Sequence, residues 1–175
     1  MKYTLLILAV LGLPFLLTAQ NDFFAQFRKK YADQENVTHL SLNGTLLKFA
    51  SQQSTDDNTD KLFNALTGLE LIAFEKNATQ VSKDLPQILN SLKGESFEDL
   101  AYFRNQEGNN VRIMVREKNT IITDVFLLIN GEKQFLMLNL QGKMKYTDLN
   151  DLHIDVNGAE ELKKLPEDRK KLKRA

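Results

Sequence analysis

A run of alternating side chains from Val111 to Gly142 constrains the fold more than any other part of the sequence. Successive side chains of a β-strand point to opposite faces, so this period of two predicts three strands. Asn130-Gly131 predicts a two-residue hairpin turn, and the odd-length loop 118–120 gives the preceding hairpin a compatible register. In that register Val125 lies opposite both Ile113 and Leu136. The run therefore predicts an antiparallel sheet with two distinct faces.

One of these faces is apolar and is predicted to be the core. It carries Val111, Ile113, Val115, Val125, Leu127, Leu136, Leu138 and Leu140. Burying one such side chain contributes about 1.5–3 kcal/mol, so this pairing is hard to displace. We expect helices to cover this face with Phe24, Phe27, Leu62, Phe63, Ile88 and Leu89.

The other face mixes charged, aromatic and methionine side chains. It carries Arg112, Met114, Arg116, Asp124, Phe126, Phe135 and Met137. Arginine, methionine and aromatic residues are enriched where proteins meet, so we predict that this face binds a protein partner or a second copy. The alternative is a solvated face whose charges pair weakly, contributing about 0–1 kcal/mol.

The rest of the sequence predicts a mixture of helices and strands. Helical spacing of Phe23, Phe24, Phe27 and Tyr31 indicates an amphipathic helix, and strands are expected at 37–42, 69–76 and 97–104. Further helices are expected at 46–50, 60–68 and 82–93. The prediction is a single α+β domain over 20–158, with a largely antiparallel sheet ending in a hairpin-linked strand run and helices packed on one face. The basic segment 159–175 is predicted to be a frayed or disordered tail.

The first nineteen residues have the order of a secretory signal peptide: an early lysine, an apolar run, and small residues before Gln20. We expect cleavage near Ala19-Gln20 and export to the periplasm or the medium, and a retained membrane anchor is the alternative. The chain has no cysteine, which excludes disulfides and a lipid attached through a cysteine thioether. Membrane contact is expected to be peripheral at most, through the basic tail.

Signals for catalysis are weak throughout the sequence. The two histidines, His39 and His153, lie far apart, so no metal site is predicted, and no cofactor-binding motif occurs. The zero net charge argues against nucleic-acid binding. These observations favour a non-catalytic binding module. The alternative is a hydrolase or transferase whose site is assembled from scattered Asp, Ser, Thr and Arg residues.

Three quoted segments resemble a known family in their order: "DFFAQFRKKYADQENVTHLSLN", "LTGLELIAFEK" and "VRIMVREKNTIITDVFLLINGEKQFLMLNLQGKM". Together with the signal peptide, they resemble the exported bacterial proteins of domain of unknown function 4252, known mainly from Bacteroidetes. The resemblance covers about Asp22 to His153. It implies a cell-envelope location and an α+β fold, and it brings no catalytic residues. Many members are lipoproteins, whereas this chain lacks the cysteine for such an anchor.

Overall fold

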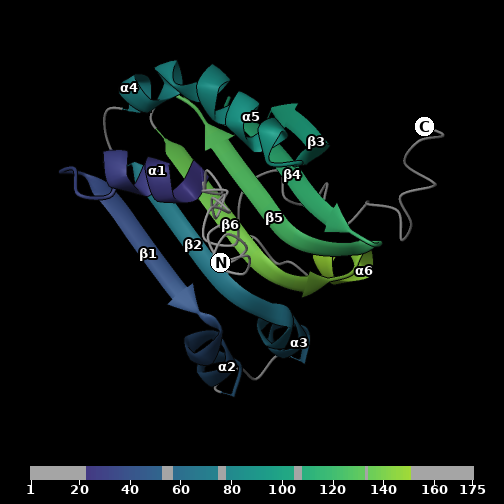
Figure 1. The fold of residues 1–175 in the computed structure, drawn as a ribbon. Coiled ribbons are helices and arrows are strands. Elements are labelled where there is room, and N and C mark those ends of the chain that lie inside the picture. Colours follow the sequence, from purple (N-terminus) through teal and green to yellow (C-terminus); the bar gives the residue numbers. More distant parts are fainter. Residues whose placement is uncertain (1–22, 53–56, 75–77, 105–107, 133, 151–175) are drawn as a thin grey trace, which may run out of the picture.

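A six-stranded antiparallel sheet dominates the computed structural model, which describes residues 23–52, 57–74, 78–104, 108–132 and 134–150 (Figure 1). The spatial order is β1-β2-β6-β5-β4-β3. The strands are β1 (Val37–Asn43), β2 (Leu66–Phe74), β3 (Glu98–Arg104), β4 (Asn110–Lys118), β5 (Ile121–Asn130) and β6 (Phe135–Met144). The helices are α1 (Phe23–Tyr31), α2 (Gly44–Gln52), α3 (Asp57–Ala65), α4 (Ala78–Lys83), α5 (Leu85–Gly94) and α6 (Tyr146–Asn150). The predicted α+β class with an antiparallel sheet is confirmed, while the predicted signal peptide and tail lie outside the described residues.

Two helix boundaries show how local chemistry sets the elements. The backbone N–H of Leu46 donates to the Asn43 side chain at 3.0 Å, so Asn43 caps α2. The single helix predicted for 82–93 is two helices, because α4 ends at Lys83 and α5 begins at Leu85. Pro86 fits the first turn of α5, where its missing N–H costs no helical hydrogen bond.

The predicted strand register is wrong by an even number of residues in both hairpins. Val125 lies opposite Val115 and Leu140, and not opposite Ile113 and Leu136. Because each shift is even, every side chain keeps its predicted face. The β4–β5 turn is the two residues Asn119 and Thr120, whose φ angles are 53° and 66°.

The β5–β6 turn is longer than the two residues expected from Asn130-Gly131. Asn130 pairs with Phe135, so four residues, 131–134, connect the strands. Glycine at position 131 is explained by lack of space for a side chain, and not by the positive φ of a primed turn. A Cβ on Gly131 would lie 1.7 Å from Oδ1 of Asn109, whose side chain fills that space.

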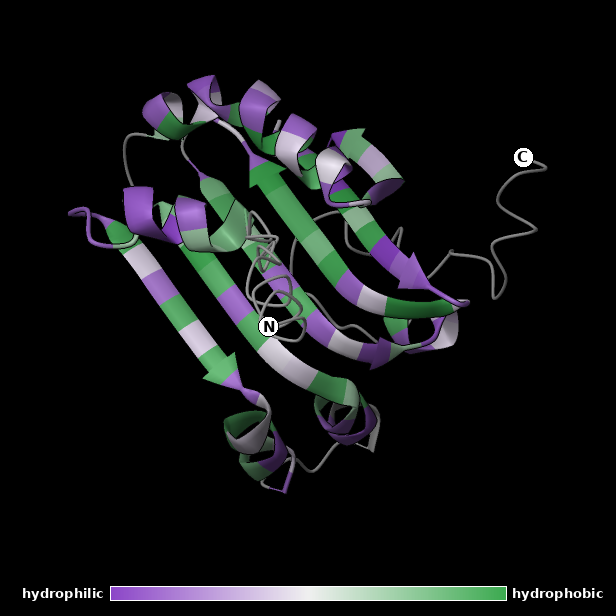
Figure 2. Ribbon diagram, in the orientation of Figure 1, coloured by the Kyte–Doolittle hydropathy of each residue, from purple (hydrophilic) through white to green (hydrophobic). Residues whose placement is uncertain are grey.

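The core has two parts, one on each face of the sheet. On one face α1, α4 and α5 cover a cluster that includes Ile72, Phe74, Phe126, Phe135 and Met137 (Figure 1). On the other face, side chains from α2, α3 and α6 pack with the predicted core row of β4, β5 and β6. Figure 2 shows that β5 is hydrophobic over a long continuous stretch, as expected for a strand buried on both faces.

The predicted assignment of helices to faces is therefore only half right. Leu62 and Phe63 pack on the predicted face. Phe24, Phe27 and Ile88 pack on the opposite face, the one predicted to bind a partner. Both faces are apolar enough to need cover, and α1 brings four buried aromatic side chains to the face with the larger aromatic and methionine residues.

Candidate functional site

The seven residues of the predicted binding surface share one face of β4, β5 and β6, as expected. The prediction that this face is exposed is wrong for five of them: Met114, Phe126, Phe135 and Met137 each have 0% exposed area, and Asp124 has 3%. Phe24 of α1 contacts the Phe126 ring edge-on at 5.5 Å, and Phe27 stacks on Phe135 at 6.4 Å. The side chains that resemble an interface are interior packing, because the helices of the same chain cover them.

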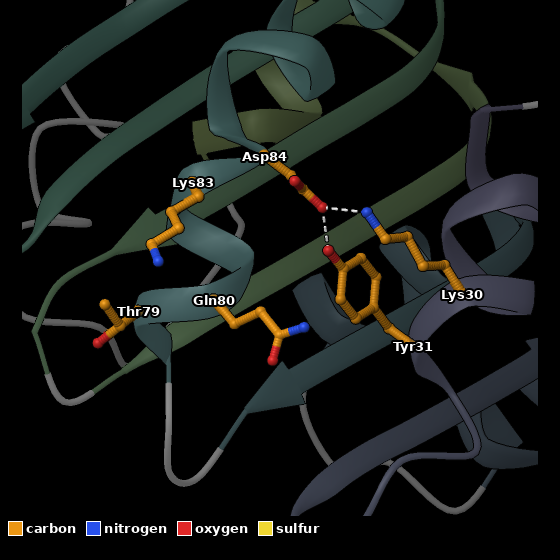
Figure 3. A pocket seen from close by; sticks show the side chains of 6 residues that line it. All are labelled: Lys30, Tyr31, Thr79, Gln80, Lys83 and Asp84. Carbon is orange, nitrogen blue, oxygen red and sulfur yellow. Dashed lines mark hydrogen bonds and ion pairs between the residues drawn. The ribbon is translucent and has the colours of Figure 1, made fainter.

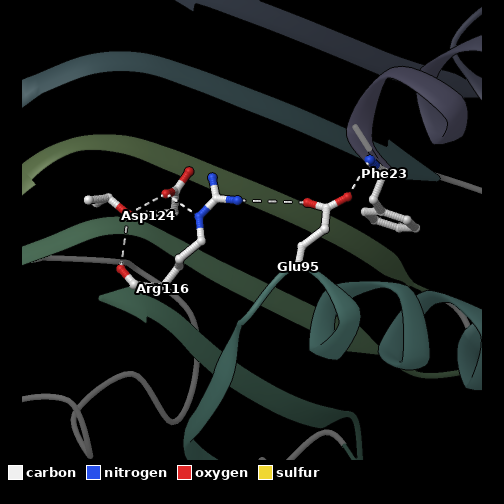
Figure 4. A network of polar contacts seen from close by, with 5 residues as sticks. Phe23, Glu95, Arg116 and Asp124 are labelled. Atoms are coloured by element: carbon white, nitrogen blue, oxygen red, sulfur yellow. Dashed lines mark hydrogen bonds and ion pairs between the residues drawn. The ribbon is translucent and has the colours of Figure 1, made fainter. Parts of the chain in front are cut away.

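The charged members of the predicted surface form a network that ties several elements together (Figure 4). Nε of Arg116 donates to Oδ2 of Asp124 at 2.8 Å, and the two residues lie directly opposite each other. Arg116 also approaches Glu95 at 3.9 Å and lies over the Phe97 ring at 5.0 Å. The other oxygen of Glu95 accepts the backbone N–H of Phe23 at 2.7 Å. This network joins α1 and the end of α5 to the sheet.

Arg112, the remaining arginine, pairs with the neighbouring edge strand. Its Nη1 lies 2.8 Å and 3.0 Å from the two carboxylate oxygens of Asp99, and its guanidinium lies 4.9 Å from the centre of the Tyr102 ring. Both contacts are to β3. Arg112 therefore holds β3 against β4.

A hollow of about 570 Å³ lies between α1 and α4 (Figure 3). Its lining consists of Lys30, Tyr31, Thr79, Gln80, Lys83 and Asp84. Lys30 and the Tyr31 hydroxyl both donate to the same oxygen, Oδ2 of Asp84. Asp84 stands between α4 and α5, so this carboxylate fixes α1 against the helix pair. No local pattern in the sequence indicates this cluster, because Asp84 lies more than fifty residues from Lys30 and Tyr31.

The pKa values of Asp84, Lys30 and Tyr31 are shifted away from neutral pH. Hydrogen bonds from Lys30 and then Tyr31 lower the pKa of Asp84, and the hydrogen bond to Asp84 raises the pKa of Lys30. Burial, followed by the hydrogen bond to Asp84, raises the pKa of Tyr31. At neutral pH the cluster is an ammonium, a carboxylate and a neutral phenol. A general acid or base works best with a pKa near the working pH, so these shifts suit structure more than proton transfer.

The pairing at Asp84 predicts a pH dependence of stability. Because the folded-state pKa lies below the ordinary 3.8, Asp84 stabilises the fold above that pH, and this contribution is lost as the pH falls through the folded-state value. In Asp84→Asn, we expect a lower free energy of unfolding at neutral pH and a smaller loss on acidification. Urea unfolding across a pH series measures both, with Asp33→Asn at an exposed position as the matched control. An equal deficit for Asp84→Asn at every pH would contradict this assignment.

The open edge of the sheet at β1 is the described feature best suited to contact another molecule. Among the residues that the structure describes, β1 has one neighbouring strand, β2, and its residues 38–41 are exposed. Leu40 is 41% exposed in the middle of the strand. The segment Val37–Asn43 contains no lysine, arginine, acid or proline, and its pairing with β2 has no bulge. Natural edge strands usually carry charged residues, a proline or a bulge, which prevent further strands from pairing. An edge strand without these features is a template for strand pairing.

The other edge strand, β3, is blocked in the usual ways. Its pairing with β4 is interrupted by an irregularity between Asp99 and Ala101. Charged residues, Glu98, Asp99 and Arg104, occupy three of its seven positions. The two edges of the same sheet therefore differ in their capacity to accept a further strand. The sequence indicated β1 as a strand but not as an edge, because strand order is not visible in a period-two pattern.

Within the described residues, no three His, Asp or Glu side chains are grouped closely enough to hold a metal ion. His39 has one acidic neighbour, with Nε2 3.3 Å from Oε1 of Glu70, and His153 lies outside the described residues. Among the described helices, none combines the length and the apolar character needed to cross a membrane.

Comparison with known proteins identifies the family of this chain. No curated protein and no solved structure matches the chain. A family model described as Domain of unknown function (DUF4252) matches residues 31–152. The matched region contains the whole sheet and begins at the last residue of α1. It spans more than half of the 175 residues, so the chain belongs to the family described as Domain of unknown function (DUF4252).

Proposed function

We propose that this chain is an exported, non-catalytic binding module that contacts its partner through the open edge of its sheet at β1. The observation that carries the proposal is the contrast between the unblocked β1 and the bulged, charged β3. An extended segment of a partner can add to such an edge by main-chain hydrogen bonds. The proposal replaces the sheet face predicted from the sequence with the sheet edge as the contact surface.

Two further observations support a binding role over catalysis. The lysine, tyrosine and aspartate of the hollow between α1 and α4 are held in protonation states unsuited to proton transfer at neutral pH. The Arg116 network is likewise engaged in holding elements together. Export is proposed from the order of residues in 1–19.

The proposal predicts a position-specific crosslink in the cells that make the protein. A photoreactive amino acid at residue 40 should yield a product larger than the monomer, because Leu40 lies on the open edge. The same group at residue 121 is the matched control, since Ile121 is 42% exposed but lies on the interior strand β5. Products from both positions in equal yield, or from neither, would overturn the edge as the contact surface.

Export is checked on the same cells. Fractionation should place the protein in the periplasm or the medium, and N-terminal sequencing should begin near Gln20. A cytoplasmic protein that retains Met1 would refute export while leaving the crosslinking result to decide the binding surface.

A further inference from the structure

We infer that the partner at this edge is a second copy of the same chain, so that two β1 strands pair antiparallel and two sheets become one. This inference rests on the proposed function, because it names the occupant of the same edge. The arrangement is isologous: a two-fold axis perpendicular to the sheet relates the copies, and the same surface is used by both.

A row of apolar side chains crosses the sheet and ends at the open edge. Leu40 lies opposite Leu71, and the row continues on successive strands through Leu138, Leu127 and Ile113. Leu127 and Ile113 are buried, at 4% and 2% exposed, whereas Leu40 at the end of the row is 41% exposed. Within the described part of the chain, the neighbouring strand of Leu40 therefore lies on one side only. A further strand whose opposite residue is apolar would complete the row and remove this leucine from water.

The β1 strand of a second copy can serve as this further strand. With the two-fold axis at Leu40, the Leu40 side chains of the two copies lie opposite each other. A perpendicular axis keeps each side chain on its own face, so the apolar face of one sheet continues into the apolar face of the other. The remaining cross-strand pairs in this register are His39 with Ser41, Thr38 with Leu42 and Val37 with Asn43.

None of these pairs brings two like charges together, and no bulge or proline interrupts the strand. Like charges directly opposite destabilise a strand pair, so their absence matters for a segment that must face its own copy. The β3 edge lacks this regularity, because the irregularity between Asp99 and Ala101 disrupts its ladder.

Single cysteines can report this register, because the natural chain contains none. Residues directly opposite in an antiparallel pair have Cα atoms about 4.5–5.5 Å apart, within the span of a disulfide. Leu40→Cys, produced from the full reading frame, should therefore form a disulfide-linked dimer under mild oxidation. Thr38→Cys lies about 13 Å from its own copy in this register and should remain largely monomeric, as should Leu42→Cys. The double variant Thr38→Cys with Leu42→Cys should regain the dimer.

Self-association without a crosslink is measured by sedimentation over a series of concentrations. Leu40→Lys should raise the dimer dissociation constant at least about tenfold, because it places two ammonium groups opposite each other on the axis. Ile121→Lys, the matched change at an equally exposed site away from the edge, should leave it unchanged. Thermal unfolding of the reduced cysteine variants and of both lysine variants verifies that each one folds.

The outcomes separate this inference from the proposed function. Equal disulfide yields at residues 38, 40 and 42 would indicate random collision and overturn self-pairing. A purified chain that stays monomeric, while residue 40 crosslinks to a different protein in cells, would overturn self-pairing and leave the edge as the binding surface. Absence of any crosslink from residue 40 in cells, together with a monomeric purified chain, would overturn both.

Discussion

Replacing Phe126 with alanine is expected to lower the free energy of unfolding by about 3–5 kcal/mol. The ring has 0% exposed area and lies edge-on to Phe24 of α1 and to Phe97, with centroid distances of 5.5 Å and 6.2 Å. Removing it leaves a cavity beneath α1 that the surrounding aromatic side chains cannot fill without leaving their own contacts. Because small domains are typically stable by about 5–15 kcal/mol, the variant should lose a large share of its stability. Urea unfolding measures the loss.

Phe49→Ala is the matched control for this experiment. Phe49 is 63% exposed on α2, so the same change there should alter the free energy of unfolding by less than about 0.5 kcal/mol. The comparison also decides between the two interpretations of the face that carries Phe126. A loss of similar size at both positions would mean that Phe126 is not packed beneath α1, and the face would again be a candidate binding surface.

Gly142→Ala is expected to destabilise the fold by about 3 kcal/mol, near the upper end of the usual cost of overpacking. Gly142 lies opposite Leu66, where β2 meets β6. A Cβ at this position would lie 2.3 Å from the carbonyl oxygen of Ala65 and 3.0 Å from the Cα of Leu66. Both are backbone atoms that cannot rotate aside, so β2 and β6 must separate locally. Urea unfolding of the variant gives the cost directly.

Gly94→Ala makes the same chemical change without the clash. Nothing lies within 4 Å of a Cβ on Gly94, at the end of α5. Alanine there should be neutral or stabilising by up to about 1 kcal/mol, because it restricts the unfolded chain. If Gly142→Ala proved as harmless as Gly94→Ala, the close approach of β2 to β6 at this point would be wrong.

The sequence was informative about which side chains share a face and uninformative about which face is covered. Phe126 and Met137, on neighbouring strands, share a face in the structure as predicted, because alternation survives a register shift of four residues. Which face the helices cover depends on tertiary packing. Both faces carried enough apolar side chains to attract helices, and the stripe of α1 containing Phe24 and Phe27 fits an aromatic face as readily as an aliphatic one.

The position of β1 at the edge depends on contacts between residues far apart in the sequence. The connection through α4 and α5 leads from β2 to β3 at the opposite edge of the sheet, and β2 pairs with β6, the last strand of the chain in this sheet. No local pattern specifies that choice. The Asp84 cluster could likewise not be predicted from the sequence, because Lys30 and Asp84 meet only once α1 has docked. The candidate edge could therefore be recognised only after the strand order was known.

The pairing of β2 with β6 also has a consequence for the order of folding. Leu69 and Leu140 lie opposite each other although about 70 residues separate them, whereas hairpin partners such as Leu127 and Leu138 are close in the chain. Closing the longer loop costs roughly 1.5 kcal/mol more in chain entropy. We expect the meander from β3 to β6 to form first and the β1–β2 pair to dock afterwards. Until it docks, the backbone of β6 is an unpaired strand edge, so slow docking would expose the newly made chain to aggregation through β6.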